Sequence, residues 1–322
     1  GIEKASKFMI PTLFVLLAVG MVRAVTMPGA TTGLHYLFNP DFSQLGNSKV
    51  WLEAFTQIAW STGAGWGFMI TYAVYTKEKE DVACNSFITG LADTSAALIA
   101  AMAVIPCIFA MAPNNYEEVL GAGNTGLTFI WLAKLFPEMP GGSIVATLFF
   151  LAMTFAALTS LYAMYEVSIR NFMDAGWPRK KATVFVAVAS FIVGIPSAVN
   201  IEFFNNQDQV WGVGLLVSGL MFALAMKKYG LEKARLEDIN PVSDVKVGRW
   251  WNVCVSAFPA LFAIICGWWI WQQFTWYPDT WWNPLETYSP GTMFMQWGIV
   301  IILLLAFNKK IADAVKTKDV SM

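Results

Sequence analysis

Three groups of polar residues interrupt otherwise apolar stretches, and they are where this sequence could do chemistry. The first lies in the glycine-rich run Gln57–Gly67 (QIAWSTGAGWG), where three glycines alternate beside two hydroxyls. The second is the carboxylate of Asp93, and the third is the adjacent pair Thr159 and Ser160. Carboxylate, hydroxyl and carbonyl oxygens are the ligands that hard cations prefer. Cation binding is therefore the chemistry that these residue types allow.

The alternating glycines favour a break in a helix. Each glycine in a helix interior is about 1 kcal/mol less favourable than alanine. Gly63, Gly65 and Gly67 are spaced by two, so they point in different directions around a helix. Glycines that let helices pack closely are four residues apart, and such packing is the alternative interpretation. We expect an unwound hinge, because secondary transporters hold ions and substrates at breaks of this kind.

Asp93 lies about ten residues inside its apolar stretch, or roughly 15 Å deep at 1.5 Å per residue. A carboxylate at that depth is a functional hypothesis by default. Its possible roles are a cation ligand, a proton carrier or a hydrogen-bonded group that packs helices together.

Thr159 and Ser160 also have two interpretations. Hydroxyls inside helices usually donate back to a carbonyl one turn earlier. Alternatively, both hydroxyls and the carbonyl of Ala156 are oxygen ligands for a hard cation. Further along the same stretch, Glu166 could orient helix ends or join an internal gate.

Transmembrane helices must position these residues. Of the 322 residues, 57% are hydrophobic and 13% are charged, whereas an average soluble domain carries roughly 25% charge. So little charge cannot cover a water-facing surface, which indicates an integral membrane protein with the lipid bilayer as its partner. A formal net charge of −1 offers no basic face, and this excludes a nucleic-acid-binding protein.

The apolar stretches set the topology, because crossing the hydrocarbon core takes roughly 20 residues. Eight stretches qualify, at about 8–26, 52–75, 84–112, 143–170, 182–199, 210–226, 252–273 and 292–307. An even number places both chain ends on one side. All of the 21 lysines and arginines except Arg23, Lys49 and Lys134 lie toward that side. The positive-inside rule then predicts a multi-pass protein of the cell (inner) membrane with both ends cytoplasmic.

One external segment, 113–142, contains the amphipathic stretch Thr125–Phe136, which Pro137 and Pro140 are expected to end. It is either a helix on the bilayer surface or a hairpin that folds back over a vestibule.

Four cysteines without a CxxC spacing are expected to be buried small hydrophobes, and the single histidine, His35, cannot build a metalloenzyme site alone.

Taken in order, these features resemble the neurotransmitter:sodium symporter family, specifically its bacterial amino-acid-transporter branch. The segments that carry the resemblance are Phe136–Gly142, Leu148–Leu151 and Phe155–Ser160 for the external hairpin and eighth helix, Gly1–Pro11 for the fifth helix, and Pro40–Phe42 with Gln57–Gly67 for the broken sixth helix. The resemblance covers nearly the whole chain and is weak after about residue 230.

The resemblance implies an all-α fold in which helices one to five and six to ten form an inverted repeat. The chain would be a single, partial transmembrane domain over 1–322, comprising the fifth helix at 1–26, the second repeat at 52–226 and two peripheral helices at 252–307. The second helix of the chain would be unwound at mid-membrane. Helices one to four, which complete the sites, would be missing partners from the same protein.

The resemblance also implies site residues, with two sodium sites each only partly supplied by this chain. Ser61 and Asp93 would join the first sodium site, where aspartate replaces the asparagine often found. The second would use Ala156, Thr159 and Ser160. The substrate pocket would be lined by Trp60, Ser61, Gly63, Gly65, Trp66, Ser160 and Met164. The extracellular gate would involve Gln57 and Asp208.

Some positions depart from the family's pattern. Trp66 stands where a smaller or phenyl ring is usual, while Gly63 is expected to enlarge the space beside it, so the substrate cannot be identified from relatives. Gln209 aligns with the usual gating aspartate, and Asp208 is adjacent. Ala97 stands where some members carry an acidic or hydroxyl residue, which leaves chloride dependence open.

The function predicted is a sodium-coupled symporter for an amino acid or similar small amine, working by alternating access. One alternative is a non-transporting fragment or an ion-sensing membrane subunit, which the presence of four upstream spans would decide. An intramembrane enzyme is disfavoured because HExxH is absent and Gly90–Asp93 lacks the second glycine of a GxGD motif.

Overall fold

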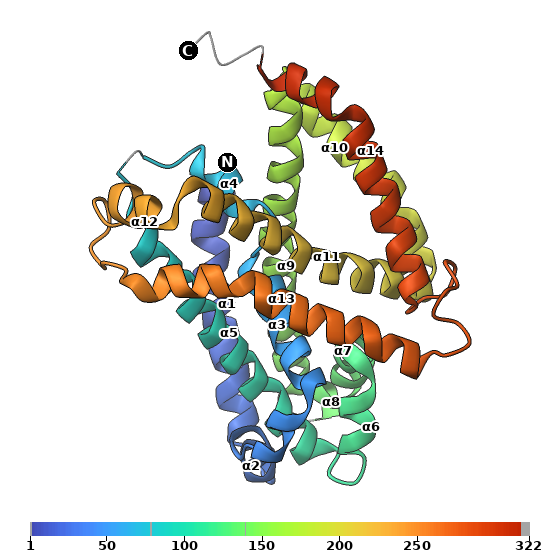
Figure 1. The fold of residues 1–322 in the computed structure, drawn as a ribbon. Coiled ribbons are helices and arrows are strands. Elements are labelled where there is room, and N and C mark those ends of the chain that lie inside the picture. The colour runs from blue at the N-terminus through green and yellow to red at the C-terminus, as the bar shows by residue number, and fades with distance from the viewer. Residues whose placement is uncertain (1, 78, 139, 317–322) are drawn as a thin grey trace. The chain divides into compact units, whose positions relative to one another are not determined.

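The computed structural model describes residues 2–77, 79–138 and 140–316. Gly1, Met139 and Lys318, which contribute to the sequence interpretation, lie outside these ranges. Every regular element in the described ranges is a helix (Figure 1), so the prediction of an all-α fold is confirmed.

Seven of the described helices are long and apolar enough to cross a membrane. They are α1 (Ile2–Val25), α5 (Val82–Met111), α9 (Gly142–Asp174), α10 (Arg179–Val199), α11 (Ile201–Tyr229), α13 (Arg249–Trp276) and α14 (Pro290–Lys316). Each coincides with one of the eight predicted spans. The remaining predicted span, about 52–75, differs because it is two short helices, α3 (Ser48–Thr62) and α4 (Phe68–Ala73).

Short helices fill the connections. They are α2 (Ala30–Phe38), the 3₁₀ turn η1 (Phe42–Gly46), α6 (Tyr116–Gly121), α7 (Gly123–Thr125), the π-helical η2 (Gly126–Trp131), α8 (Leu132–Glu138), α12 (Leu231–Lys233) and the π-helical η3 (Ala234–Ile239). The sequence did not predict α2.

The chain divides into two compact units. Unit 1 comprises Gly1–Phe42 and Thr89–Ala163, and unit 2 comprises Ser43–Ile88 and Met164–Met322. Helices α5 and α9 contribute residues to both units.

The core of unit 1 shows how the external segment 113–142 packs. Leu132 and Phe136 of α8 are only 1% and 2% exposed, and they pack with Ala30, Cys107 and Phe149 from α2, α5 and α9. The segment is therefore folded back onto the unit, which agrees with the hairpin interpretation. Helix α8 ends at Glu138, between Pro137 and Pro140, where the two prolines predicted its end.

Unit 2 is built around α11. Val210 and Val213 pack with Leu52 of α3, Trp269 of α13 and Met293 of α14. A second core lies between α9 and α10, where Ile169 contacts Ala182 and Val186.

The segment before α13 is held to the start of α5 in unit 2 by hydrogen bonds. The backbone N–H groups of Asp244 and Cys84 donate to the Asp81 carboxylate at 2.7 and 2.9 Å, and these bonds lower the pKa of Asp81. The N–H of Ala83 donates to Ser243 Oγ at 3.2 Å.

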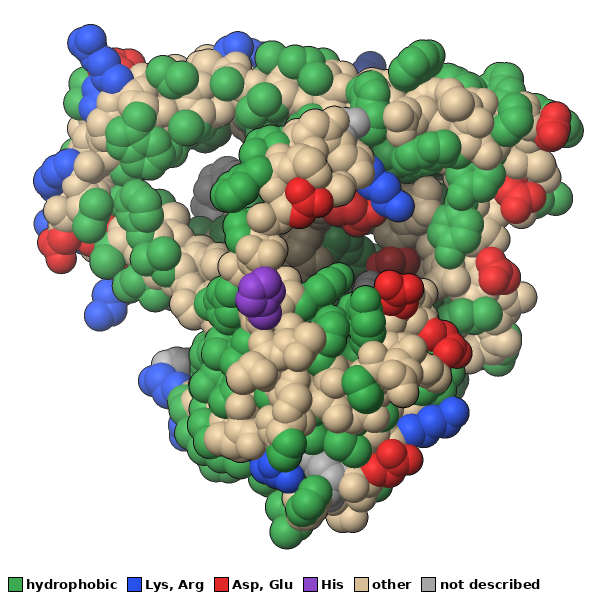
Figure 2. Space-filling view, turned by 90° about the horizontal axis from the view of Figure 1, so that it is seen from below, with side chains coloured by type: hydrophobic (Ala, Val, Ile, Leu, Met, Phe, Trp, Pro, Cys, Tyr) green, Lys and Arg blue, Asp and Glu red, His purple; other side chains and the backbone are tan. Residues whose placement is uncertain are grey.

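Large apolar side chains remain on the surface of the long helices. Apolar groups cover much of the face shown in Figure 2, and Phe191, Val199 and Leu305 are each more than 70% exposed. Such surfaces are expected where helices meet lipid.

The predicted burial of all four cysteines is wrong for Cys254, which is exposed, whereas Cys107 and Cys266 are buried.

The contact between α2 and α5 yields a prediction. A Cβ on Gly33 would lie 2.7 Å from the Pro106 Cα, whereas a Cβ on Gly194 in α10 would meet nothing within 4 Å. We expect Gly33→Ala to destabilise the chain by about 1–3 kcal/mol through overpacking. Gly194→Ala should be neutral or slightly stabilising, because alanine is the better helix former. Thermal unfolding of the two variants in detergent tests this, and equal midpoints would contradict it.

Candidate functional site

The break between α3 and α4 is made by glycine backbone conformations. Gly63, Gly65 and Gly67 have φ values of 72°, 83° and 82°, a region that side-chain-bearing residues rarely adopt. Helix α3 ends where the N–H of Gly63 donates to the Trp60 carbonyl, and the N–H of Trp66 then donates to the Gly63 carbonyl at 3.2 Å. The interruption that the glycine spacing predicted is therefore present, while its depth in a membrane stays a prediction.

Helix α11 approaches the break closely in unit 2. The Ser218 hydroxyl donates to the Gly65 carbonyl at 2.7 Å. A Cβ on Gly65 would lie 2.5 Å from the Leu215 carbonyl oxygen, so a side chain cannot be accommodated there. Sequence reasoning missed Ser218; its only signal was one hydroxyl in an apolar helix.

The predicted space beside Gly63 is already filled. A Cβ on Gly63 would lie 2.7 Å from the Phe68 ring. This ring stacks on Trp66, with centroids 5.5 Å apart, and Trp66 meets Trp60 edge-on at 4.9 Å. The expectation that Gly63 enlarges a pocket is wrong for this structure, because Phe68 folds back over it.

Trp66 keeps an unused hydrogen-bond donor. Its indole packs beside the cluster of Ala59, Leu215, Leu216 and Cys266. The Nε1 atom is buried, and no hydrogen-bond partner for it is found among the described residues. Leaving such a group unpaired costs about 1–3 kcal/mol, so the break contains a donor that a ligand could satisfy.

Asp93 and Ala156, two of the four predicted cation ligands in unit 1, line one cavity, whereas Thr159 and Ser160, also within the described ranges, are not part of its lining. The cavity has a volume of about 400 Å³, and its wall is otherwise mostly apolar and includes Leu13, Leu17 and Phe149. The Thr159 hydroxyl donates to the Ala156 carbonyl at 2.8 Å, so Thr159 makes the within-helix bond of the simpler interpretation. Ser61 belongs to unit 2, and its pairing with Asp93 stays a prediction.

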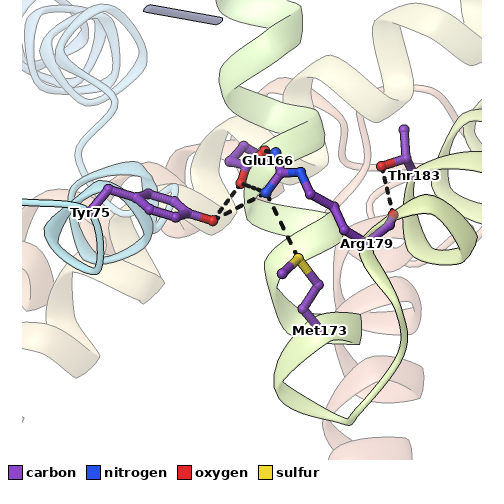
Figure 3. A network of polar contacts seen from close by, with 5 residues as sticks. All are labelled: Tyr75, Glu166, Met173, Arg179 and Thr183. Atoms are coloured by element: carbon purple, nitrogen blue, oxygen red, sulfur yellow. Dashed lines mark hydrogen bonds and ion pairs between the residues drawn. The ribbon is translucent and has the colours of Figure 1, made fainter. Parts of the chain in front are cut away.

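Glu166 is the centre of a polar network in unit 2 (Figure 3). It is 3% exposed and receives two hydrogen bonds from Arg179, Nη2 to Oε2 at 2.6 Å and Nη1 to Oε1 at 2.9 Å. The Tyr75 hydroxyl also donates to Oε1, at 2.8 Å. The network joins α9, the start of α10 and the residues just after α4. These bonds link Glu166 to the start of α10 and to Tyr75 just after α4, which is compatible with both predicted roles, orienting helix ends and joining an internal gate.

The predicted gate residues lie in unit 2. Asp208 and Trp60 line a cavity of about 480 Å³ with Glu53, Gln209 and Trp269. Among the described residues, the lining includes Thr56 from α3 but not Gln57. Met164 belongs to unit 2 and Ser160 to unit 1, so a shared substrate pocket stays a prediction.

These features define a multi-pass membrane protein with one interrupted helix, and comparison with known proteins identifies its family. The sequence profile of the sodium:neurotransmitter symporter family matches residues 1–315. The chain belongs to this family. Because its members are transporters, the intramembrane-enzyme alternative is set aside.

Similar proteins agree with this assignment. An uncharacterised sodium-dependent transporter of Methanocaldococcus jannaschii is 32% identical over 78% of this chain and 53% of its own length. The sodium-dependent serotonin transporter of Drosophila melanogaster is 26% identical over 82% of this chain and 44% of its own. The crystal structure of MhsT in complex with L-phenylalanine matches with a TM-score of 0.69 and 29% identity, covering 82% of this chain and 61% of MhsT. The chain spans about half the length of the curated relatives it matches.

The Ser218–Gly65 bond yields the next prediction. Ser218→Ala leaves the Gly65 carbonyl without its side-chain donor and should destabilise the chain by about 1 kcal/mol. Ser218→Thr keeps the hydroxyl and should retain most of the stability. Ser190→Ala, at an exposed serine of α10, is the control and should have little effect. Thermal unfolding in detergent measures all three, and an unchanged midpoint for Ser218→Ala would refute the anchoring role.

Proposed function

We propose that this chain works in a sodium-coupled symporter for an amino acid or similar small amine, by alternating access. The observation that carries the proposal is the break at Gly63–Gly67, which α11 anchors and which leaves backbone groups outside any helix. Breaks of this kind hold substrates and ions in secondary transporters. Membership of a family of sodium-dependent transporters supports the coupling ion.

The substrate would bind at this break, contacting Trp60, Ser61, Gly63, Gly65 and Trp66. The unpaired Trp66 Nε1 supports this placement, because an acceptor on the substrate would satisfy it. The Gly65 carbonyl accepts one hydrogen bond from Ser218, and its second lone pair would be left for the substrate or an ion. Ser160 and Met164 would complete the pocket. MhsT, crystallised with L-phenylalanine, makes an amino acid the leading substrate class.

Two sodium sites would use oxygen atoms from this chain. Ala156, Thr159 and Ser160 would supply one, and Ser61 with Asp93 would supply part of the other. Hydroxyl, carbonyl and carboxylate oxygens suit a hard cation. Chloride dependence stays open at Ala97, which lines the cavity beside Asp93.

Further helices of the same protein would complete these sites. The cavity that Asp93 shares with Leu13 and Leu17 has a largely apolar wall, which suits another apolar helix, and the match covers only about half the length of the relatives. The whole protein would lie in the cell membrane with both ends of this chain in the cytoplasm. Gln57 and Asp208 would act at the outer gate, and the Glu166–Arg179 network at the inner one.

The sodium assignment leads to a prediction for the complete transporter in proteoliposomes. Thr159→Val together with Ser160→Ala removes two hydroxyl oxygens and should abolish sodium dependence of amino-acid uptake. Thr154→Val is the matched control, because Thr154 makes the same kind of bond, to the Phe150 carbonyl, on the same helix. This control should keep the sodium half-saturation of the wild type.

Two results would contradict the proposal. An unchanged sodium half-saturation in the double variant would mean that these hydroxyls serve only their helix. Absence of sodium-driven uptake of any amino acid or amine by the unmodified complete protein would favour the ion-sensing alternative.

Asp93 allows a separate prediction, because a cation ligand and a proton carrier differ in what they need. Asp93→Asn keeps an oxygen but removes the charge, so a ligand role predicts weaker sodium affinity with transport largely retained. A proton carrier must release and rebind a proton in every cycle, which asparagine cannot do. Loss of uptake with unchanged sodium binding, measured with ²²Na⁺, would therefore overturn the ligand role.

A further inference from the structure

A groove lies at the start of α10, on the surface of unit 2. It has a volume of about 710 Å³. Its wall is formed by the apolar side chains of Trp177, Val184, Phe185 and Val188, and the remaining lining includes Lys180 and Lys181. An apolar wall with two cations at one end differs from the uniformly apolar surface expected against lipid tails.

Packing holds the two aromatic side chains of the groove wall, Trp177 and Phe185, in place. Phe172, Trp177 and Phe185 contact one another in a triad, with ring centroids 5.0 to 5.3 Å apart. The chain reverses before α10 through Gly176, whose φ is 95°, and the N–H of Trp177 donates to the Phe172 carbonyl at 2.9 Å. The opposite face of α10 is buried through Ala182 and Val186. The backbone turn, the aromatic triad and the buried face of α10 therefore set the position of Trp177 and Phe185 in the groove wall.

Three consecutive cations at this point face two different environments. Arg179 is committed to Glu166 in the network of Figure 3. Lys181 lies over the Trp177 ring, with Nζ 4.2 Å from its centroid, and Lys180 lines the same groove. Among the described residues, neither lysine forms an ion pair with a carboxylate. Two uncompensated positive charges thus stand at the end of an apolar groove.

We propose that this groove binds an anionic phospholipid. Lys180 and Lys181 would contact the phosphate, and the acyl chain would lie along Val184, Phe185 and Val188. The three apolar residues follow the lysines along a helix that crosses the membrane, so headgroup and chain would meet the groove in the order that a bilayer presents them. A free phosphate would leave this apolar wall without a partner. The proposal depends on α10 spanning a membrane and is independent of the transport cycle.

The test measures lipid binding by the detergent-solubilised 322-residue chain, using native mass spectrometry. The probes are dioleoylphosphatidylglycerol and dioleoylphosphatidylcholine. Each lysine near an anionic lipid surface contributes enough to change affinity roughly fivefold. We expect Lys180→Gln with Lys181→Gln to weaken phosphatidylglycerol binding by about tenfold or more and to leave phosphatidylcholine binding unchanged.

Matched variants separate this site from general charge attraction. Lys227 and Lys228 are another exposed lysine pair near the end of a spanning helix, α11, and their replacement by Gln should leave the tight phosphatidylglycerol site intact. Lys180→Arg with Lys181→Arg keeps the charge and should retain binding. Val188→Asn keeps the lysines but disrupts the wall, so it should weaken both lipids several-fold.

Three results would overturn the proposal. One is unchanged phosphatidylglycerol binding after Lys180 and Lys181 are replaced by Gln. Another is an equal loss with the Lys227 and Lys228 variant, which would indicate diffuse attraction. The third is full displacement of the lipid by inorganic phosphate at constant ionic strength, which would assign the lysines to a free anion.

Discussion

The need to satisfy the backbone hydrogen-bonding groups that a helix break releases governs the arrangement of unit 2. A helix satisfies these groups internally, and a break leaves some of them without a partner in the same helix. At Gly63–Gly67 the released groups find partners in the protein: Trp66 N–H donates to Gly63, and Ser218 donates to Gly65. The break therefore requires both a left-handed backbone and a close approach of α11. Glycine at position 65 meets both requirements, because it adopts φ of 83° and has no Cβ to meet Leu215.

The short helix after the break is held in place by contacts with other helices of unit 2. Helix α4 has only six residues, too few to be stable without outside contacts. Tyr75, two residues beyond it, donates to Glu166, which Arg179 holds through two hydrogen bonds. A buried carboxylate is tolerated only when it is paired and hydrogen-bonded. The break is thus attached on one side to α11 and on the other to α9 and α10, so movement of these helices within unit 2 would move the break.

Much of this arrangement could be predicted from the sequence, because it depends on local chemistry. Long apolar runs identify spanning helices by length, and alternating glycines identify a break by their spacing. The Phe68 ring over Gly63 and the Ser218–Gly65 bond could not be predicted, since both depend on how segments fold onto each other. The burial of Cys254 was predicted wrongly because a cysteine can face either lipid or protein, and only the packing of the helices decides which. The hairpin at Leu132 and Phe136 was one of two interpretations until packing distinguished them.

The contact between Thr159 and Ala156 does not by itself decide whether these residues bind a cation. A bond within the helix and cation ligation are the two roles that the sequence allows for Thr159. The structure contains the first, with the Thr159 hydroxyl donating its hydrogen to the Ala156 carbonyl. Donation uses the hydroxyl hydrogen, whereas ligation of a cation uses oxygen lone pairs. A carbonyl oxygen likewise has two lone pairs and can accept a hydrogen bond while it contacts a cation. The observed bond therefore fixes the orientation of both oxygens and is compatible with either role.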